Sequence, residues 1–190
     1  MYRSHLPKRI QQSSEPLPLE AVPSNKQLLK RGYMEMLRES KVRYFLTLTL
    51  MFSTTSMRAQ NSLDQLVVNL NENIYKQRYF DKKNFLKGFV AREYTDQMKS
   101  DHFHILLNEN EEYNLPAHGK MIKKIQKEVN NINRHSKLGK ISSIDLQEYF
   151  NNGDDALEKY FLKMFDGFQN QDTCNDSIGI LDHNGVLFGS

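Results

Sequence analysis

Alternating side chains between Val42 and Phe52 constrain this fold more than any other feature of the sequence. Leucine alternates there with phenylalanine or threonine, in the order Phe45, Leu46, Thr47, Leu48, Thr49 and Leu50. Successive side chains of a β-strand point to opposite faces of a sheet, so one face of this strand is aliphatic and the other carries hydroxyl groups. The run therefore predicts a sheet strand whose two faces differ chemically.

The remaining sequence patterns place this strand within a definite order of elements. A β-branched, aromatic or alternating composition predicts strands, and apolar residues three or four apart predict helices. Further strands are expected at 84–94, 101–107 and 141–150, with helices at 56–79, 117–134 and 154–165. This order is typical of split β-α-β folds of the ferredoxin-like type. We therefore predict an α+β protein with a central antiparallel sheet flanked by helices.

The two ends of the chain differ from this core in composition. Residues 1–24 contain four of the five prolines, which predicts an extended or disordered leader. Asn25 is expected to cap the next helix. The apolar face of that helix would consist of Leu28, Leu29, Tyr33, Met36 and Leu37. We expect one domain over 25–165, followed at 166–190 by a polar linker and a short hairpin with an Asn184-Gly185 turn.

Composition excludes several classes of protein. Hydrophobic residues make up 38% of the 190 residues and charged residues 26%. The longest apolar stretch is much shorter than the about 20 residues that cross a bilayer, and no N-terminal segment resembles a secretion signal, so we expect a cytoplasmic protein without membrane contact. The single cysteine, Cys174, excludes a disulfide framework and a zinc site of several thiolates. A net charge of +3 is too small by itself to indicate nucleic acid.

Two histidines on one expected strand are the strongest sign of chemistry. His102 and His104 are two residues apart and so share a face, while Phe103 points to the other. If this strand and the preceding one fold about Gln97 and Met98, Glu93 lies opposite His102, and the small Ala91 lies opposite His104. Two imidazoles and a carboxylate form a site for Mg²⁺ or Mn²⁺. The alternative is two ordinary histidines near an exposed glutamate.

A nucleophile for such a site is suggested by Tyr160. Lys163 follows three residues later, so both side chains project from one face of the expected helix, and the ammonium group could stabilise charge on a phosphate. The same spacing occurs at Tyr79 and Lys82, and Tyr160 could instead be a core aromatic residue.

The expected helix at 117–134 and the residues after it are strongly basic. Glu128 is the one acid among seven basic residues, which are Lys120, Lys123, Lys124, Lys127, Arg134, Lys137 and Lys140. We expect the first five of these residues to contact DNA. They would lie on a helix that stands beside the histidines and runs along a phosphate backbone. The alternative is a solvated helix face above a buried apolar one. His118 and His135 are expected at the surface.

Three of these segments, taken in order, resemble the motifs of the HUH endonucleases, and specifically the rolling-circle replication initiators. The first motif is matched by Phe45-Leu46-Thr47-Leu48-Thr49, the second by His102-Phe103-His104, and the third by Tyr160-Phe161-Leu162-Lys163. An acidic third ligand stands upstream of the histidines in that family, at the place of Glu93. The resemblance covers roughly residues 41 to 165.

The resemblance implies a specific activity. Tyr160 would attack a phosphodiester of single-stranded or hairpin origin DNA, leaving a 5′-phosphotyrosine link and a 3′-hydroxyl that primes replication. Lys163 would orient the phosphate, and Thr47 and Thr49 would contact DNA. With no phosphate-loop motif, a separate helicase and host replication proteins would be partners. A single tyrosine would require a second subunit, as in a homodimer, or another nucleophile. The rivals are a transposase or relaxase with the same motifs, and a DNA-binding regulator that does not cleave.

Overall fold

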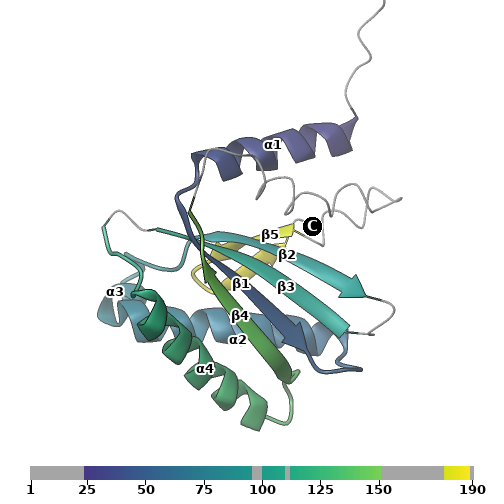
Figure 1. The fold of residues 1–190 in the computed structure, drawn as a ribbon, viewed down its shortest axis with the longest axis vertical. Coiled ribbons are helices and arrows are strands. Elements are labelled where there is room, and N and C mark those ends of the chain that lie inside the picture. The colour runs from purple at the N-terminus through teal and green to yellow at the C-terminus, as the bar shows by residue number, and fades with distance from the viewer. Residues whose placement is uncertain (1–23, 96–99, 110–111, 151–177, 189–190) are drawn as a thin grey trace, which may run out of the picture.

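A six-stranded antiparallel sheet forms the centre of the protein in this computed structural model (Figure 1). The structure describes residues 24–95, 100–109, 112–150 and 178–188. The strands are β1 (Val42–Leu50), β2 (Gly88–Thr95), β3 (Ser100–Asn108), β4 (Ile141–Glu148), β5 (Ile178–Asp182) and β6 (Gly185–Phe188). The helices are α1 (Asn25–Glu39), α2 (Ser56–Tyr75), α3 (Gln77–Phe80) and α4 (His118–Arg134).

The strand order is β4-β1-β3-β2-β5-β6, and every neighbouring pair is antiparallel. Its first four strands have the order of a split β-α-β fold, so the predicted α+β class with a central antiparallel sheet is confirmed. The single helix expected over 56–79 is interrupted at Lys76, where φ is 53°. A lysine in this left-handed region ends α2, and α3 starts at the next residue.

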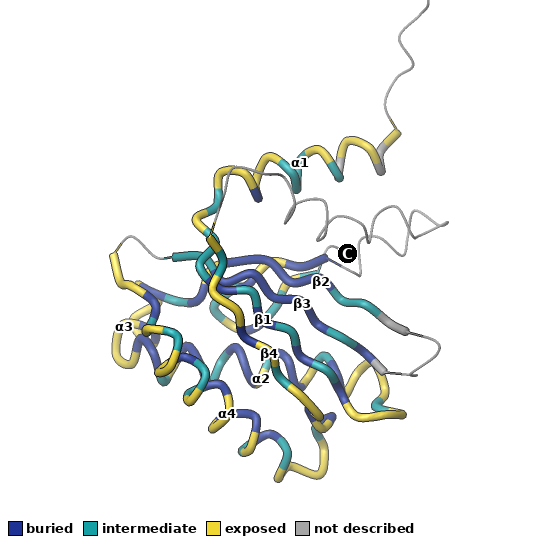
Figure 2. The backbone as a smooth tube through the Cα atoms, in the orientation of Figure 1, coloured by how far each residue is buried: buried dark blue, intermediate teal, exposed yellow. Residues whose placement is uncertain are grey.

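Helices α2 and α4 cover one face of the sheet (Figures 1 and 2). The aliphatic side of β1 packs against their apolar sides in the main core, which includes Leu46, Leu48, Leu66, Ile125 and Val129. Leu46 and Leu48 are each 1% exposed. Burial of such side chains is the main stabilising contribution to a fold of this kind. The threonine side of β1 therefore faces away from α2 and α4.

Helix α1 covers part of the opposite face. Leu37 packs there with Phe89, Leu106 and Ile178, and Tyr33 and Met34 lie against this cluster. The expected helix is confirmed, but Leu28 and Met36 are largely exposed, so part of the predicted apolar face is wrong. Among the described side chains of α1, those that pack on the sheet lie in its C-terminal half, at Tyr33, Met34 and Leu37.

The cap of α1 also differs from the prediction. Ser24, rather than Asn25, is the N-cap: its hydroxyl accepts a hydrogen bond from the Gln27 N–H, and the Gln27 side chain accepts one from the Ser24 N–H. This reciprocal pair is a capping box, which the prediction missed because Asn is as good an N-cap residue as Ser.

The C-terminal hairpin is confirmed, and it extends the sheet. Strand β5 pairs with β2, with Phe89 opposite Ile180 and Ala91 opposite Ile178. The turn lies one residue earlier than expected, because Asp182 pairs with Gly185 and leaves His183 and Asn184 as the loop. Gly185 has a φ of 137°, where a side chain would be strained and would also meet Asp64.

In the part of the chain that the structure describes, no helix is both long and apolar enough to cross a membrane. The expected leader, the expected helix at 154–165 and the polar linker lie outside the described residues, except for Ser24 at the end of the leader.

Candidate metal centre

Both histidines lie on the face of the sheet that α2 and α4 leave open. In β3, Phe103 and Ile105 are buried in the main core, so His102 and His104 point to the other side. The β2–β3 register places Glu93 opposite His102 and Ala91 opposite His104, as predicted. The residues of the candidate site therefore come from neighbouring strands of one sheet face.

Strand β1 supplies a hydroxyl group to each imidazole. Thr47 lies opposite His104, and a hydrogen bond of 3.3 Å joins Thr47 Oγ1 and His104 Nδ1. Thr49 lies opposite His102, and Thr49 Oγ1 and His102 Nδ1 are 3.1 Å apart. A hydrogen bond at one ring nitrogen orients a histidine so that the other nitrogen can bind a metal. From the sequence, these threonines were expected to contact DNA, and their pairing with the histidines was missed.

The carboxylate of Glu93 meets His104 rather than His102. Glu93 Oε2 is 3.1 Å from His104 Nε2, and the side chains are 32% and 9% exposed. Diagonal neighbours on adjacent strands are within reach of a long side chain. Ala91, the direct cross-strand partner of His104, has only a methyl group and is itself buried. The predicted strand register is correct, but the Glu93 side chain extends toward His104 instead of His102.

Two proton arrangements satisfy the His104 ring. A neutral imidazole has one N–H. If Nε2 carries it, Nε2 donates to Glu93 and the Thr47 hydroxyl donates to Nδ1. If Nδ1 carries it, Nε2 and the Glu93 oxygen both present lone pairs at 3.1 Å, and a shared proton or a cation must lie between them. The second arrangement has the protonation state that a metal ligand needs.

These donors fit a divalent cation in their chemistry. Two imidazole nitrogens and one carboxylate leave positions open for substrate oxygens. Among the described residues, however, no three His, Cys, Asp or Glu side chains are arranged as they would be around a metal ion. What the structure shows is a His104–Glu93 pair with His102 on the same face.

Phe45 extends the site, and its functional place was not predicted from the sequence. Its ring lies parallel to the His104 imidazole, with 5.7 Å between the centroids and 6° between the planes. Phe45 and Thr47 alternate with the buried leucines of β1, so the side chain of Phe45 belongs to the same face. A stacked aromatic ring restricts the orientation of the imidazole. The signal in the sequence was the same alternation that identified the strand.

Strand β4 adds polar groups to this face. Asp145 lies opposite Thr47 and Ser143 opposite Thr49, while Ile144 and Leu146 turn toward the main core. Asp145 and Ser143 are exposed, and Asp145 Oδ2 accepts a hydrogen bond of 2.7 Å from the Gln147 side chain. Asp145 is thus a carboxylate on the open face that no sequence motif singled out.

The basic helix lies on the opposite face of the sheet, which corrects the prediction that it stands beside the histidines. Lys120, Lys123, Lys127 and Arg134 of α4 are exposed there. Lys124 is partly buried, and its amine donates hydrogen bonds to the backbone and side-chain oxygens of Asn73 in α2. Burial lowers the pKa of this amine. The helix is basic because its outer side is solvated and its inner side packs on the sheet.

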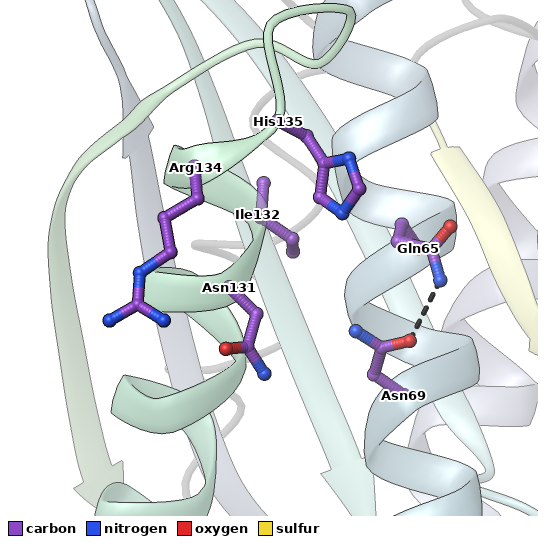
Figure 3. Close-up of a pocket in the computed structure, with 6 residues that line it drawn as sticks. All are labelled: Gln65, Asn69, Asn131, Ile132, Arg134 and His135. Carbon is purple, nitrogen blue, oxygen red and sulfur yellow. Dashed lines mark hydrogen bonds between the residues drawn. The ribbon is translucent and has the colours of Figure 1, made fainter.

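A polar pocket of about 390 Å³ lies between α2 and α4, away from the histidines (Figure 3). Its lining residues are Gln65, Asn69, Asn131, Ile132, Arg134 and His135. Gln65 donates a hydrogen bond of 2.7 Å to Asn69. His135 is exposed, as predicted. His118, in contrast, is partly buried beside Tyr44, and its Nε2 is 2.9 Å from the Leu146 carbonyl oxygen, so its assignment to the surface was wrong.

Tyr160 and Lys163 lie outside the described residues, so their places relative to the histidines stay a prediction. No protein-family model, curated protein or solved structure matches this chain.

Proposed function

We propose that this protein is a metal-dependent endonuclease that nicks and rejoins single-stranded DNA through a tyrosine nucleophile, and so initiates rolling-circle replication of a plasmid or phage-like element. The observation that carries the proposal is the group of His102, His104 and Glu93 on the sheet face opposite α2 and α4. Threonines at both imidazole Nδ1 atoms and a carboxylate at one Nε2 are the surroundings expected of metal-binding histidines.

In this proposal Mg²⁺ or Mn²⁺ would be held by Glu93, His102 and His104, and it would polarise the scissile phosphate and help to orient it. Thr47 and Thr49 hold the imidazoles in the required orientation.

The proposed step exchanges one ester bond to phosphorus for another. The phenolate oxygen of Tyr160 forms a bond to phosphorus, and the bond from phosphorus to the 3′-oxygen breaks. The phenol proton is lost and the leaving 3′-oxygen gains one, so the products are a 5′-phosphotyrosine and a free 3′-hydroxyl. Lys163 would stabilise the negative charge on the phosphate. Rejoining is the same exchange in reverse.

The proposal also includes the setting of the reaction. Origin DNA, single-stranded or in a hairpin, would be the substrate, and the protein would act in the cytoplasm. A separate helicase would unwind the duplex and host proteins would copy it. A second subunit would supply the tyrosine that closes the displaced circle.

A covalent adduct is the most direct test. The full-length protein is incubated with Mn²⁺ and labelled single-stranded DNA of the replicon that encodes it, and the products are separated on a denaturing gel. We expect a protein–DNA band that is absent for Tyr160→Phe and reduced at least a hundredfold for His104→Ala.

Tyr113→Phe is the matched control, because Tyr113 is exposed and lies outside the proposed site. This variant should form as much adduct as the wild-type protein. A wild-type protein that forms no adduct, or an adduct that persists in Tyr160→Phe, would show that the proposed mechanism is wrong. A wild-type protein that formed no adduct but still bound the DNA would support the alternative of a DNA-binding regulator that does not cleave.

A further inference from the structure

Three apolar side chains are exposed where β1 leads into α2, at the end of the sheet that carries the histidines. Met51, Phe52 and Met57 are 48%, 67% and 75% exposed. Met51 follows Thr49, the hydrogen-bond partner of His102, by two residues. A group of large apolar residues that a fold leaves in solvent often marks a binding surface.

The α4–β4 loop is fixed against this segment by backbone contacts. The Met51 N–H donates to the Lys140 carbonyl at 2.7 Å, and the Gly139 N–H donates to the Arg58 carbonyl at 3.2 Å. A Cβ atom on Gly139 would collide with the Thr54 side chain, so glycine is required for this close approach. The two segments therefore form one surface, here called the strand-end surface, which consists of residues 51–58 and 135–140.

Asn133, at the end of α4, fixes the α4–β4 loop further. Its side-chain oxygen accepts a hydrogen bond from the Ile141 N–H, and its amide group donates one to the Ile141 carbonyl. The side chains of the strand-end surface are thus presented on a well-bonded backbone, which reduces the entropic cost of binding a ligand.

Exposed cations lie on the same two segments as the apolar residues. Arg58 lies beside Met57 on α2, and Lys137 and Lys140 lie on the α4–β4 loop; all three are exposed. Within the described part of the chain, no carboxylate lies within ion-pair distance of these three groups. An exposed aromatic ring among cations that lack ion pairs is the chemistry that binds unpaired nucleic acid, since the ring stacks on a base and the cations contact phosphates.

We propose that the strand-end surface binds the unpaired DNA strand next to the nicking site, with Phe52 stacked on a base and Arg58, Lys137 and Lys140 on its phosphates. The inference rests on the proposed function for its choice of DNA and adds a binding surface to it. A duplex keeps its bases stacked on each other and offers Phe52 no exposed base face.

The test measures binding of a fluorescein-labelled dT20 strand by anisotropy, in EDTA so that no cleavage occurs. Phe52→Ala should weaken binding about tenfold, which is within the range found when one base–aromatic stack is removed. Phe52→Tyr keeps the ring and should bind like the wild-type protein. Phe80→Ala, which removes a phenylalanine that is 61% exposed on α3, is the matched control and should bind normally.

The contribution of Lys137 and Lys140 is measured separately, from the salt dependence of the DNA affinity. The double variant Lys137→Ala/Lys140→Ala should lower the slope of log K against log salt by about 0.7 for each phosphate that the protein no longer neutralises. Normal dT20 binding by Phe52→Ala, an equally weakened binding in Phe80→Ala, or an equal effect on dT20 and duplex binding would overturn the inference.

The adduct assay separates this inference from the proposed function. An adduct with wild-type protein, together with normal dT20 binding by Phe52→Ala, would refute the strand-end surface and leave the nicking activity intact. No adduct with wild-type protein, together with dT20 binding that depends on Phe52, would refute the nicking activity and leave the surface. The melting temperature of each variant shows that the fold is retained.

Discussion

At the scale of single residues, the threonines of β1 occupy one ring nitrogen of each histidine with a hydrogen bond. Thr47 is hydrogen-bonded to Nδ1 of His104 and Thr49 to Nδ1 of His102. The Glu93 carboxylate is hydrogen-bonded to Nε2 of His104. The threonines thus have a positioning role in addition to any contact with DNA.

We predict that Thr47→Val weakens Mn²⁺ binding by about 10- to 100-fold, because it keeps the shape of the side chain but removes the hydroxyl that orients His104. Isothermal titration calorimetry measures the affinity. Ser142→Ala is the control, since its hydroxyl donates only to backbone carbonyls of β1, at Thr49 and Leu50. An unchanged affinity in Thr47→Val would contradict the positioning role.

Part of this site could be predicted from the sequence. The pairing of Glu93 with His102 followed from the short link between two strands, because a hairpin determines which residues lie opposite each other. The lean of Glu93 toward His104 could not be predicted, since it depends on side-chain rotation. The contacts of Thr47 and Thr49 with the histidines could have been predicted by placing β1 beside β3, because both strands alternate apolar and polar residues.

At the scale of elements, Asp64 joins α2 to the C-terminal hairpin. Its carboxylate accepts hydrogen bonds from the Val186 N–H and the Gln60 side chain. Burial nevertheless raises the pKa of Asp64 above its ordinary value of 3.8. The folded protein therefore binds this proton more tightly than the unfolded chain. The stability that results is present below the ordinary pKa and disappears as the pH rises through the raised pKa.

We therefore predict that Asp64→Asn raises the melting temperature at neutral pH by a few degrees, because it removes the cost of a partly buried charge and keeps the oxygen that accepts from Val186. The gain should vanish below about pH 4, where the wild-type carboxyl is itself protonated. Thermal unfolding at several pH values measures this. Asp81→Asn, at an exposed position, should show no such difference. A lower melting temperature of Asp64→Asn at neutral pH would contradict the prediction.

At the scale of the whole molecule, binding of a metal ion should raise the melting temperature of the protein. A ligand that binds only the folded state stabilises it by about 2.7 kcal/mol at a hundred times its Kd, or about 5–10 °C for a chain of this size. We predict such a rise with Mn²⁺ for the wild-type protein and its absence in His104→Ala. His135→Ala, which removes an exposed imidazole elsewhere, should keep the full rise. An equal rise in both variants would locate the metal outside the candidate site.

The order of the elements was predictable because each strand and helix has a clear period, whereas the side of the sheet taken by α4 was predicted wrongly. The sequence held the necessary information. Leu46 and Leu48 must meet the apolar sides of the helices, so Thr47 and the histidines paired with β1 must point the other way. The addition of β5 beside β2 could not be predicted, because the 29 residues between β4 and β5 do not determine which edge of the sheet the chain joins when it returns.

The strand order has a consequence for how Tyr160, the proposed nucleophile, would reach its target. Strands β4 and β5 lie on opposite sides of the three strands that carry the candidate metal centre, and the chain between them contains Tyr160. That chain returns to the sheet at Ile178, which pairs with Ala91, the strand neighbour of His104. If Tyr160 is the nucleophile, its local concentration at the phosphate is set by this covalent connection. The first nick would then proceed in cis, at a rate independent of protein concentration once the DNA is bound.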